Sequence, residues 1–183
     1  ENLLEDVAKT GIKRIKFVTS HPWDFTDNIK EIINKYDNIL PFIHLPVQSG
    51  SNNILKLMGR RYTKESYLTL FNKMREGIKN ISITTDIIVG FPNETDEDFE
   101  ETLDLYNKCK FDLAYTFIYS PRVGTPAAKM KDNITEDEKK ERLERLNKLV
   151  SKYALESNKK LLNKKVSVLI EGYSEKGNDM LMG

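Results

Sequence analysis

Polar and apolar residues alternate between residues 82 and 89 in the pattern of a half-buried β-strand. Ser82, Thr84 and Asp86 fall on one face of such a strand, whereas the positions between them carry isoleucine and threonine and fall on the other. A buried strand of a parallel sheet is normally apolar on both faces, and an unpaired buried carboxylate is strongly unfavourable. Asp86 is therefore expected to meet a polar partner, such as a ligand hydroxyl, at the lumen or rim of a barrel of parallel strands.

Strand and helix patterns alternate along most of the chain. Strands are predicted at residues 14–19, 42–47, 82–89, 113–119 and 166–173, and helices at residues 2–9, 27–36, 53–58, 64–76, 96–108 and 136–162. Thr95 and Thr135 each stand three positions before an acidic residue, as in a helix capping box. This order predicts an α/β fold built from parallel βα units. Four parallel strands are too few to close a barrel, so the sequence is expected to be an excerpt from a longer protein.

The composition is that of a folded globular protein, because 39% of the 183 residues are apolar and 31% are charged. No apolar run reaches the roughly 20 residues that span a bilayer, and the acidic start is unlike a signal peptide. Cys109 is the single cysteine, which excludes an internal disulfide and favours a cytoplasmic location without a membrane partner. We expect Cys109 to be a small core residue rather than a nucleophile.

Positive charge gathers near the end of the chain, although the net charge is only +1. Residues 139–165 hold ten Lys and Arg but only three Asp and Glu. Such a concentration attracts phosphate groups, including those of nucleic acids. A solvated face on a long helix explains the same pattern equally well.

Segments rich in polar residues and glycine follow the four predicted parallel strands, at residues 19–22, 48–51, 90–95 and 119–126. In a barrel of parallel strands these ends share one edge, where ligands bind. Gln48 can donate and accept hydrogen bonds and ionised Asp86 accepts them, so the pair suits a vicinal diol such as that of a ribose. Arg60 or Arg61 can hold a carboxylate with paired donors.

Several of these features also have a purely structural explanation. Gly50 and Gly90 permit the backbone to approach a ligand closely, but the turn that contains Gly90 serves equally as a tight connection between strand and helix. Ser51 is equally suited to cap a helix. His21 and His44 lack the spacing of metal ligands, so we expect hydrogen bonds within the fold for both and no metal site. The aromatic residues expected to pack in the core or at its rim, rather than to stack on bases, are Trp23, Tyr115 and Phe117.

Four ordered segments resemble one known family. They lie at residues 19–22, 45–60, 84–95 and 115–128. In this order and at this spacing they resemble the radical S-adenosylmethionine methylthiotransferases over nearly the whole chain. The resemblance implies that residues 1–162 form the C-terminal part of a partial (β/α) radical-SAM barrel with parallel strands, including a long basic helix at 136–162. It also implies that residues 163–183 begin a small β-barrel RNA-binding domain of the TRAM type.

The resemblance assigns roles to several positions. In the family, the residues that match Gln48 and Asp86 contact the ribose of S-adenosylmethionine, and the residue that matches Arg60 contacts its carboxylate. The turn at residues 90–94 resembles the segment beside the adenine. The residues expected to bind the cofactor are Gln48, Ser49, Ser51, Arg60, Asp86, Gly90 and Glu94.

The resemblance also implies a reaction, further cofactors and partners. The chain most resembles those members of the family that insert a methylthio group at C2 of N6-isopentenyladenosine beside the anticodon of tRNA, with two 4Fe-4S clusters and an electron-donor protein. Cys109 alone cannot hold either cluster, so the ligands are expected upstream of Glu1 and the excerpt alone is expected to be inactive. No catalytic residue is assigned. Contacts to the substrate or to the tRNA anticodon stem-loop are expected at Arg122, Lys159, Lys160 and Lys164.

Three other interpretations are weighed against this one. Sibling enzymes act on threonylcarbamoyl-adenosine in tRNA or on an aspartate of a ribosomal protein, but segments 45–51 and 119–128 favour the isopentenyladenosine reaction. A non-catalytic tRNA-binding module using residues 139–165 would not need the polar strand face at 82–86, because phosphate binding requires no carboxylate. An ordinary barrel enzyme without a cluster is disfavoured because no pair of acid–base residues stands out.

Overall fold

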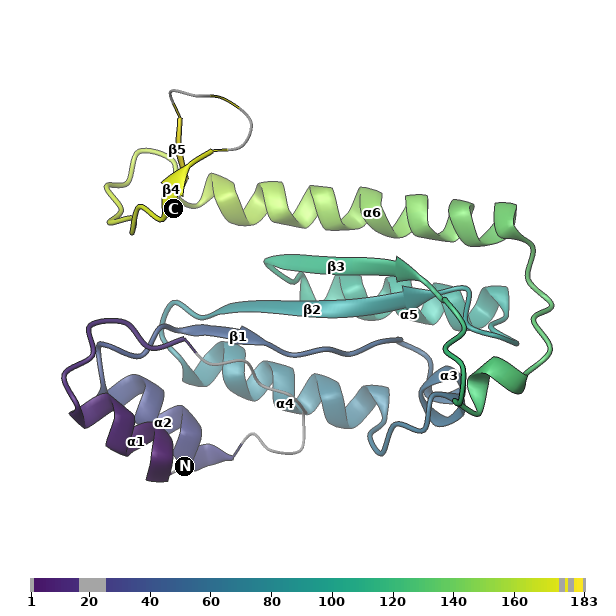
Figure 1. The fold of residues 1–183 in the computed structure, drawn as a ribbon, viewed down its shortest axis with the longest axis horizontal. Helices are drawn as coiled ribbons and strands as arrows, with labels where there is room; N and C mark the ends of the chain where they lie inside the picture. Colours follow the sequence, from purple (N-terminus) through teal and green to yellow (C-terminus); the bar gives the residue numbers. More distant parts are fainter. Residues whose placement is uncertain (1, 17–25, 175–176, 178–179, 183) are drawn as a thin grey trace.

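A parallel sheet of three strands forms the centre of the molecule (Figure 1). The computed structural model describes residues 2–16, 26–174, 177 and 180–182. The strands lie in the order β1 (Phe42–His44), β2 (Ser82–Val89) and β3 (Leu113–Ile118). The predicted bounds of β2 are confirmed, and β3 ends one residue earlier than predicted. The α/β fold with parallel strands is thus confirmed.

The strand predicted at residues 14–19 is represented by a single parallel bridge between Ile15 and Ile39. Residues 17–25 lie outside the described residues. They include the polar segment at 19–22, so the structure does not test what was expected of His21 and Trp23.

Six α-helices accompany the strands in the described ranges, all near their predicted positions. They are α1 (Asn2–Lys9), α2 (Asp27–Lys35), α3 (Asn52–Leu57), α4 (Lys64–Gly77), α5 (Asp96–Cys109) and α6 (Glu136–Lys159). The capping boxes predicted at Thr95 and Thr135 are both present. Each threonine side chain accepts from the backbone N–H three residues later, and the acidic side chain at that later position accepts from the threonine N–H. A third capping box begins α4 at Thr63. These caps fix where α4, α5 and α6 start.

The two faces of β2 differ as the sequence predicts. The residues fully buried on one face are Ile83, Thr85 and Ile87. On the other face, His44 of β1 lies within hydrogen-bond distance of two β2 side chains, with Nδ1 2.9 Å from Thr84 Oγ1 and Nε2 3.3 Å from Asp86 Oδ2. Asp86 therefore has a partner within the protein, and its side chain is 28% exposed rather than fully buried. The hydrogen bonding expected of His44 is confirmed.

Tyr115 and Phe117 of β3 stand on the same face as Asp86 and are about half exposed. The Tyr115 ring meets the His44 ring edge-on, with 6.0 Å between their centroids. About half of each aromatic side chain is therefore accessible to solvent. Their exposure excludes the core, and packing at the rim rather than stacking on bases stays a prediction.

Helix α6 runs antiparallel to the strands and lies lengthwise alongside β3, from the carboxyl ends of the strands towards their amino ends (Figure 1). Near its start, Arg142 contacts Glu94, which follows β2. Near its end, Ser157 Oγ donates to Asp112 Oδ1 at 2.6 Å, just before β3 begins. A helix of 24 residues is about 36 Å long. It ends three residues before the predicted position, because bonds between residues three apart tighten the chain after Lys159.

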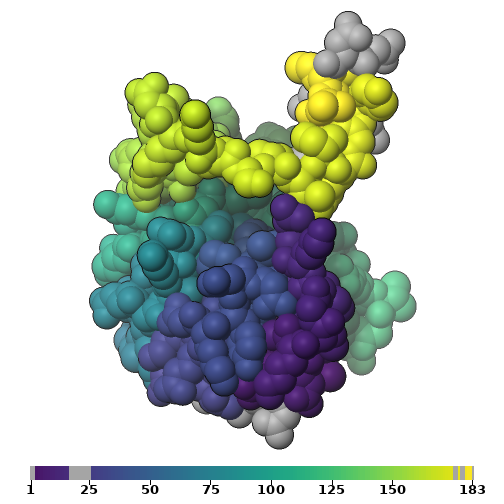
Figure 2. Space-filling model, turned by 90° about the vertical axis from the view of Figure 1, so that its left-hand side faces the viewer, coloured from purple at the N-terminus to yellow at the C-terminus, as the bar shows by residue number. Residues whose placement is uncertain are grey.

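The C-terminal segment holds far less regular structure than predicted. In the part of this segment that the structure describes, only β4 (Gly172–Tyr173) and β5 (Leu181–Met182) form a strand pair, which is antiparallel. The strand predicted at 166–173 is therefore wrong over most of its length, because residues 166–170 have no ladder partner among the described residues and are exposed. Figure 2 shows this segment, in yellow, projecting from the main body. A TRAM-like domain stays a prediction.

Candidate functional site

A pocket of about 740 Å³ lies at the carboxyl edge of the sheet, beside the ends of β2 and β3. Its wall includes Gln48, Arg60, Asp86, Phe91, Tyr119 and Arg122. Parallel βα folds bind ligands at this edge, and small-molecule sites usually enclose about 300–1,000 Å³. The sequence placed Gln48, Arg60 and Asp86 near one ligand, and the structure brings all three to one pocket.

The backbone holds Gln48 beside Asp86. The Gln48 N–H donates to the carbonyl of Asp86 at 2.8 Å, and the carbonyl of Gln48 accepts from Ile88 N–H at 2.9 Å. These bonds keep Gln48 at φ 70°, a left-handed conformation that costs a non-glycine residue about 1–3 kcal/mol. Its side chain is almost buried and makes no hydrogen bond to the described residues. Strain and a free amide at one position are typical of a ligand site.

Arg60 reaches the pocket from the turn after α3. Gly59 adopts φ 71°, which lets the chain reverse so that Arg60 N–H donates to the carbonyl of Leu55 at 2.8 Å. The Nε atom of Arg60 is buried and has no partner among the described residues. Arg61 is exposed and does not line the pocket. The choice between the two arginines therefore falls on Arg60.

Tyr119 lines the pocket and begins the polar segment predicted at 119–126, although no ligand contact was predicted for it individually. Its hydroxyl is buried without a partner among the residues described. A buried donor left unpaired costs about 1–3 kcal/mol. Two such groups on one pocket wall, Tyr119 Oη and Arg60 Nε, indicate that a polar ligand completes the site.

Ser49 and Ser51 do not line the pocket. Ser49 Oγ lies 3.3 Å from Thr102 Oγ1, and Ser51 Oγ donates to Asp98 Oδ1 at 2.5 Å. Ser51 also accepts from the first backbone amides of α3, so its role as a helix cap is confirmed. Burial alone would raise the pKa of Asp98, but hydrogen bonds from Ser51, Thr95 and nearby groups hold it below the usual value. Cofactor contact by the two serines stays a prediction, and the geometry gives it no support.

The two glycines expected beside a ligand approach helices instead. A Cβ atom on Gly50 would lie 2.5 Å from the Cα atom of Thr102 in α5. A Cβ atom on Gly90 would lie 2.5 Å from Cγ of Lys139 in α6. Their lack of a side chain therefore serves the packing of strand ends against helices. Neither glycine is on the pocket wall.

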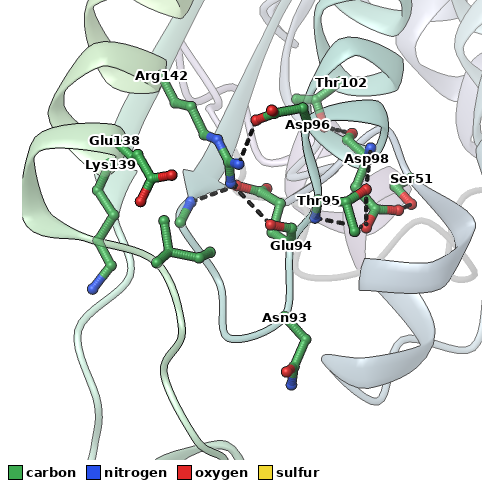
Figure 3. Close-up of polar contacts among 12 residues, drawn as sticks. Ser51, Asn93, Glu94, Thr95, Asp96, Asp98, Thr102, Glu138, Lys139 and Arg142 are labelled. Atoms are coloured by element: carbon green, nitrogen blue, oxygen red, sulfur yellow. Dashed lines mark hydrogen bonds and ion pairs between the residues drawn. The ribbon is translucent and has the colours of Figure 1, made fainter.

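Glu94 is buried behind the pocket and is also absent from its wall. Its Oε2 accepts from Gly90 N–H at 2.7 Å and from Arg142 Nη1 at 2.9 Å (Figure 3). Burial raises the pKa of Glu94, although these two hydrogen bonds oppose the shift. The sequence did not identify Arg142, because a charge on a long helix resembles an ordinary solvated face.

Of the residues expected to contact substrate or RNA, only Arg122 lines the pocket. Lys159 and Lys160 stand at the far end of α6, and Lys164 follows them. That end lies near the amino ends of the strands, opposite the pocket (Figure 1). The three lysines therefore cannot bind the same small ligand as Arg122.

The described residues include no group of three or more His, Cys, Asp or Glu side chains that could hold a metal ion. Cys109 is buried, and burial raises its pKa to about 12, so it is a core residue as expected. Among the helices of the described ranges, none is long and apolar enough to cross a membrane.

Comparison with known proteins agrees with this geometry. Residues 1–106 match the radical SAM superfamily. The chain is 58% identical over its whole length to a tRNA-2-methylthio-N(6)-dimethylallyladenosine synthase from Staphylococcus haemolyticus, and it spans 35% of that protein. It is 56% identical, again over its whole length, to the enzyme of that name from Bacillus cytotoxicus, and spans 36% of it. The chain thus spans about a third of the length of these relatives.

A solved structure shows the same fold. Coproporphyrinogen III oxidase (HemN) from Escherichia coli, a radical SAM enzyme, superposes with a TM-score of 0.66. The likeness covers 83% of this chain and 36% of that one at 19% sequence identity, so it concerns the fold alone. Because the superfamily match extends over more than half of the chain, this protein belongs to the radical SAM superfamily.

Proposed function

We propose that this chain is part of a tRNA methylthiotransferase that inserts a methylthio group at C2 of N6-isopentenyladenosine beside the anticodon. Relatives that match its whole length carry the name of that activity. Within the enzyme, the pocket at the carboxyl edge of the sheet binds S-adenosylmethionine. The observation that carries this proposal is the convergence of Gln48, Arg60 and Asp86 on one pocket, whose wall holds polar groups without a partner among the described residues.

The residues present fit S-adenosylmethionine at both of its polar ends. Asp86 accepts hydrogen bonds from the ribose hydroxyls, and His44 on its other side orients the carboxylate. Gln48 contributes a second polar group to the same diol. Arg60 binds the methionyl carboxylate, which gives its buried Nε a charged acceptor.

Held by Gln48, Arg60 and Asp86, S-adenosylmethionine would supply radical chemistry at the adenine ring of the substrate. The described residues of this chain bind and orient the cofactor. Cys109 is buried in the core, and its raised pKa disfavours the thiolate that iron requires. We therefore assign no cluster ligand and no electron-transfer step to this chain.

A binding experiment tests the cofactor proposal. In the natural protein that contains this sequence, Asp86→Asn removes a charged acceptor, which should weaken S-adenosylmethionine binding by about 1.5–3 kcal/mol, or roughly 10- to 150-fold. Asp104→Asn on α5 is the matched control, because Asp104 lies outside this pocket and pairs with Lys108. Equal affinities for wild type and Asp86→Asn would remove the ribose role.

The substrate is tested separately. In a bacterial strain that lacks the activity, expression of the natural protein should restore methylthio groups on isopentenyladenosine in tRNA. If the group returns only to threonylcarbamoyl-adenosine, the proposed substrate is wrong. If S-adenosylmethionine does not bind and tRNA does, the non-catalytic tRNA-binding module becomes the better explanation.

We also propose that the basic end of α6 contacts tRNA away from the pocket. Lys159 ends the helix about 36 Å from its start, and the exposed Lys160 and Lys164 follow it along the chain. Changing all three to glutamate should weaken tRNA binding and reduce the log–log salt slope by roughly one unit per lysine. S-adenosylmethionine affinity should stay within about twofold, since the lysines do not touch the pocket.

A further inference from the structure

A buried ion pair joins helix α6 to the turn that follows β2 (Figure 3). Arg142 Nη1 donates to Glu94 Oε2 at 2.9 Å and to the backbone carbonyl of Glu94 at 3.1 Å. Arg142 Nη2 donates to Asp96 Oδ1 at 2.8 Å. The Arg142 side chain is 6% exposed and that of Glu94 1%. One guanidinium thus binds three acceptors on either side of Thr95, where α5 begins.

The Glu94 carboxylate that Arg142 binds also forms a hydrogen bond within the same turn. Glu94 Oε2 accepts from Gly90 N–H at 2.7 Å, and Gly90 adopts φ 69°. The stem of Lys139 fills the space where a Cβ of Gly90 would stand. Lys139 is itself anchored to Asp132 at 2.6 Å and to Glu136 at 2.8 Å. Two side chains of α6 therefore define where the Gly90 backbone lies.

Gly90 leads directly to the pocket wall. Phe91 is the next residue, and its ring packs edge-on against Tyr119 with 4.9 Å between centroids. Both rings line the pocket. The Tyr119 N–H donates to the carbonyl of Val89 at 2.9 Å, so the ends of β2 and β3 are fixed together at this point. A shift of the Gly90 turn would move this part of the wall.

Attachment of α6 to the body of the protein does not require a buried charge. The α6 side chains Leu146 and Val150 are buried against the body of the protein. Arg145, also on α6, forms an exposed ion pair with Glu100 of α5. A buried ion pair is often no more stabilising than apolar residues of the same volume, because both charges lose their hydration. What the Arg142–Glu94 pair adds is a defined orientation of the carboxylate that holds Gly90.

We propose that Arg142 is a positioning residue for the cofactor pocket, acting through Glu94 to fix the Gly90–Phe91 turn and with it the affinity for the nucleoside ligand. This inference rests on the proposed function, because it takes the ligand of the pocket to be S-adenosylmethionine. It assigns no contact between Arg142 and the ligand. The effect is carried by the bond from Arg142 to Glu94 and by the bond from Glu94 to Gly90.

Two measurements on the natural protein, carrying its iron–sulfur clusters, test the proposal. The first is the affinity for S-adenosylhomocysteine by titration calorimetry, which requires no turnover. The second is hydrogen exchange of the backbone amides at residues 88–95, together with the free energy of unfolding. The variants are Arg142→Met, Arg142→Lys and Glu94→Gln, with Arg145→Met and Val150→Ala as controls.

The controls separate positioning from a general loss of stability. Arg145→Met removes the neighbouring ion pair on the same helix without touching the turn. Val150→Ala opens a cavity beneath α6 two turns further along, so it lowers stability away from the pocket. Neither control should change affinity by more than about twofold. The conservative Arg142→Lys keeps the charge but loses the paired donors.

Arg142→Met should lower the affinity by about tenfold or more and speed exchange of the Gly90 amide, because the wall is no longer preorganised. The affinity of Arg142→Lys should lie between those of wild type and Arg142→Met. The affinity of Glu94→Gln should be similar to that of Arg142→Lys. If folded Arg142→Lys and Glu94→Gln bind as tightly as wild type, the positioning role is overturned even if Arg142→Met does not fold. If wild type itself fails to bind, the proposed cofactor is wrong, which is a different outcome.

Discussion

Two aspartates at opposite edges of the same sheet show how differently this fold uses a carboxylate. At the amino edge, Asp112 accepts from Ile83 N–H at 2.8 Å, from Arg75 Nη1 at 2.9 Å and from Ser157 Oγ at 2.6 Å. At the carboxyl edge, Asp86 has only His44 at 3.3 Å among the described residues. Asp112 joins β2, β3, α4 and α6 together. Most of the hydrogen bonds that the Asp86 carboxylate can accept are therefore available to a ligand.

The difference extends to the surroundings of each residue. The Asp112 carboxylate is paired within the protein, in part by Ser157 near the end of α6, although the buried hydroxyl of nearby Tyr106 has no partner among the described residues. Near Asp86 the backbone of Gln48 is strained and Arg60 Nε is buried without a partner in the described ranges. Spare polar capacity on the wall of a pocket, rather than polarity itself, distinguishes the carboxyl edge.

The largest effect on stability is expected from Asp112→Ala. This change leaves Arg75 without its carboxylate and the Ile83 N–H without its acceptor, so unfolding free energy should fall by about 2–4 kcal/mol. Asp86→Asn should change it by less than about 1 kcal/mol, because only one long contact is altered. Urea denaturation of both variants measures the contrast. Equal losses would contradict the division between a structural and a functional edge.

The loss of folding stability at low pH should depend on protonation of Asp112. Burial opposes ionisation of this carboxyl, but hydrogen bonds from Ser157, Ile83 and Arg75 hold its pKa below the usual value. Its contribution to stability is therefore complete above the ordinary aspartate pKa of about 3.9 and is lost as the pH falls from there through the lower folded value. Asp112→Asn should flatten this part of a stability profile measured between about pH 6 and 2. An unchanged profile would show that the network does not sense the proton.

A smaller change is expected at Gln48, with opposite effects on stability and binding. Gln48→Gly relieves the left-handed backbone but makes the unfolded chain more flexible, so unfolding free energy should stay the same or rise by up to about 1 kcal/mol. Affinity for S-adenosylmethionine should fall, because the free amide is removed. A clear loss of stability without a loss of affinity would show that Gln48 is a structural residue like Asp112.

Local patterns were sufficient to predict much of the fold. The alternation at 82–89 predicted the bounds of β2 and which side chains share a face, and the threonines before α5 and α6 predicted where those helices begin. Parallel strands place their carboxyl ends together, which predicted that Gln48 and Asp86 would meet. These predictions rest on the two-residue alternation of a strand and on helix capping, and each of these signals extends over only a few residues.

Contacts between distant segments could not be predicted in this way. Arg142 lies 48 residues from Glu94, and in the sequence it is one charge among many on α6. Gly50 and Gly90 have the pattern of ligand-binding glycines, but their close neighbours are helices. The apolar run at 166–170 has strand character without a ladder partner among the described residues. In each case the deciding contact depends on packing that no local window contains.

Arg60 and its neighbour Arg61 offer the most direct test of the functional edge, because one lines the pocket and the other does not. Binding of S-adenosylmethionine to the natural protein should be compared for wild type, Arg60→Met and Arg61→Met. We predict that Arg60→Met weakens binding by about tenfold or more, and that Arg61→Met stays within about twofold of wild type. Equal affinities for Arg60→Met and wild type, or equal losses in the two variants, would contradict the account.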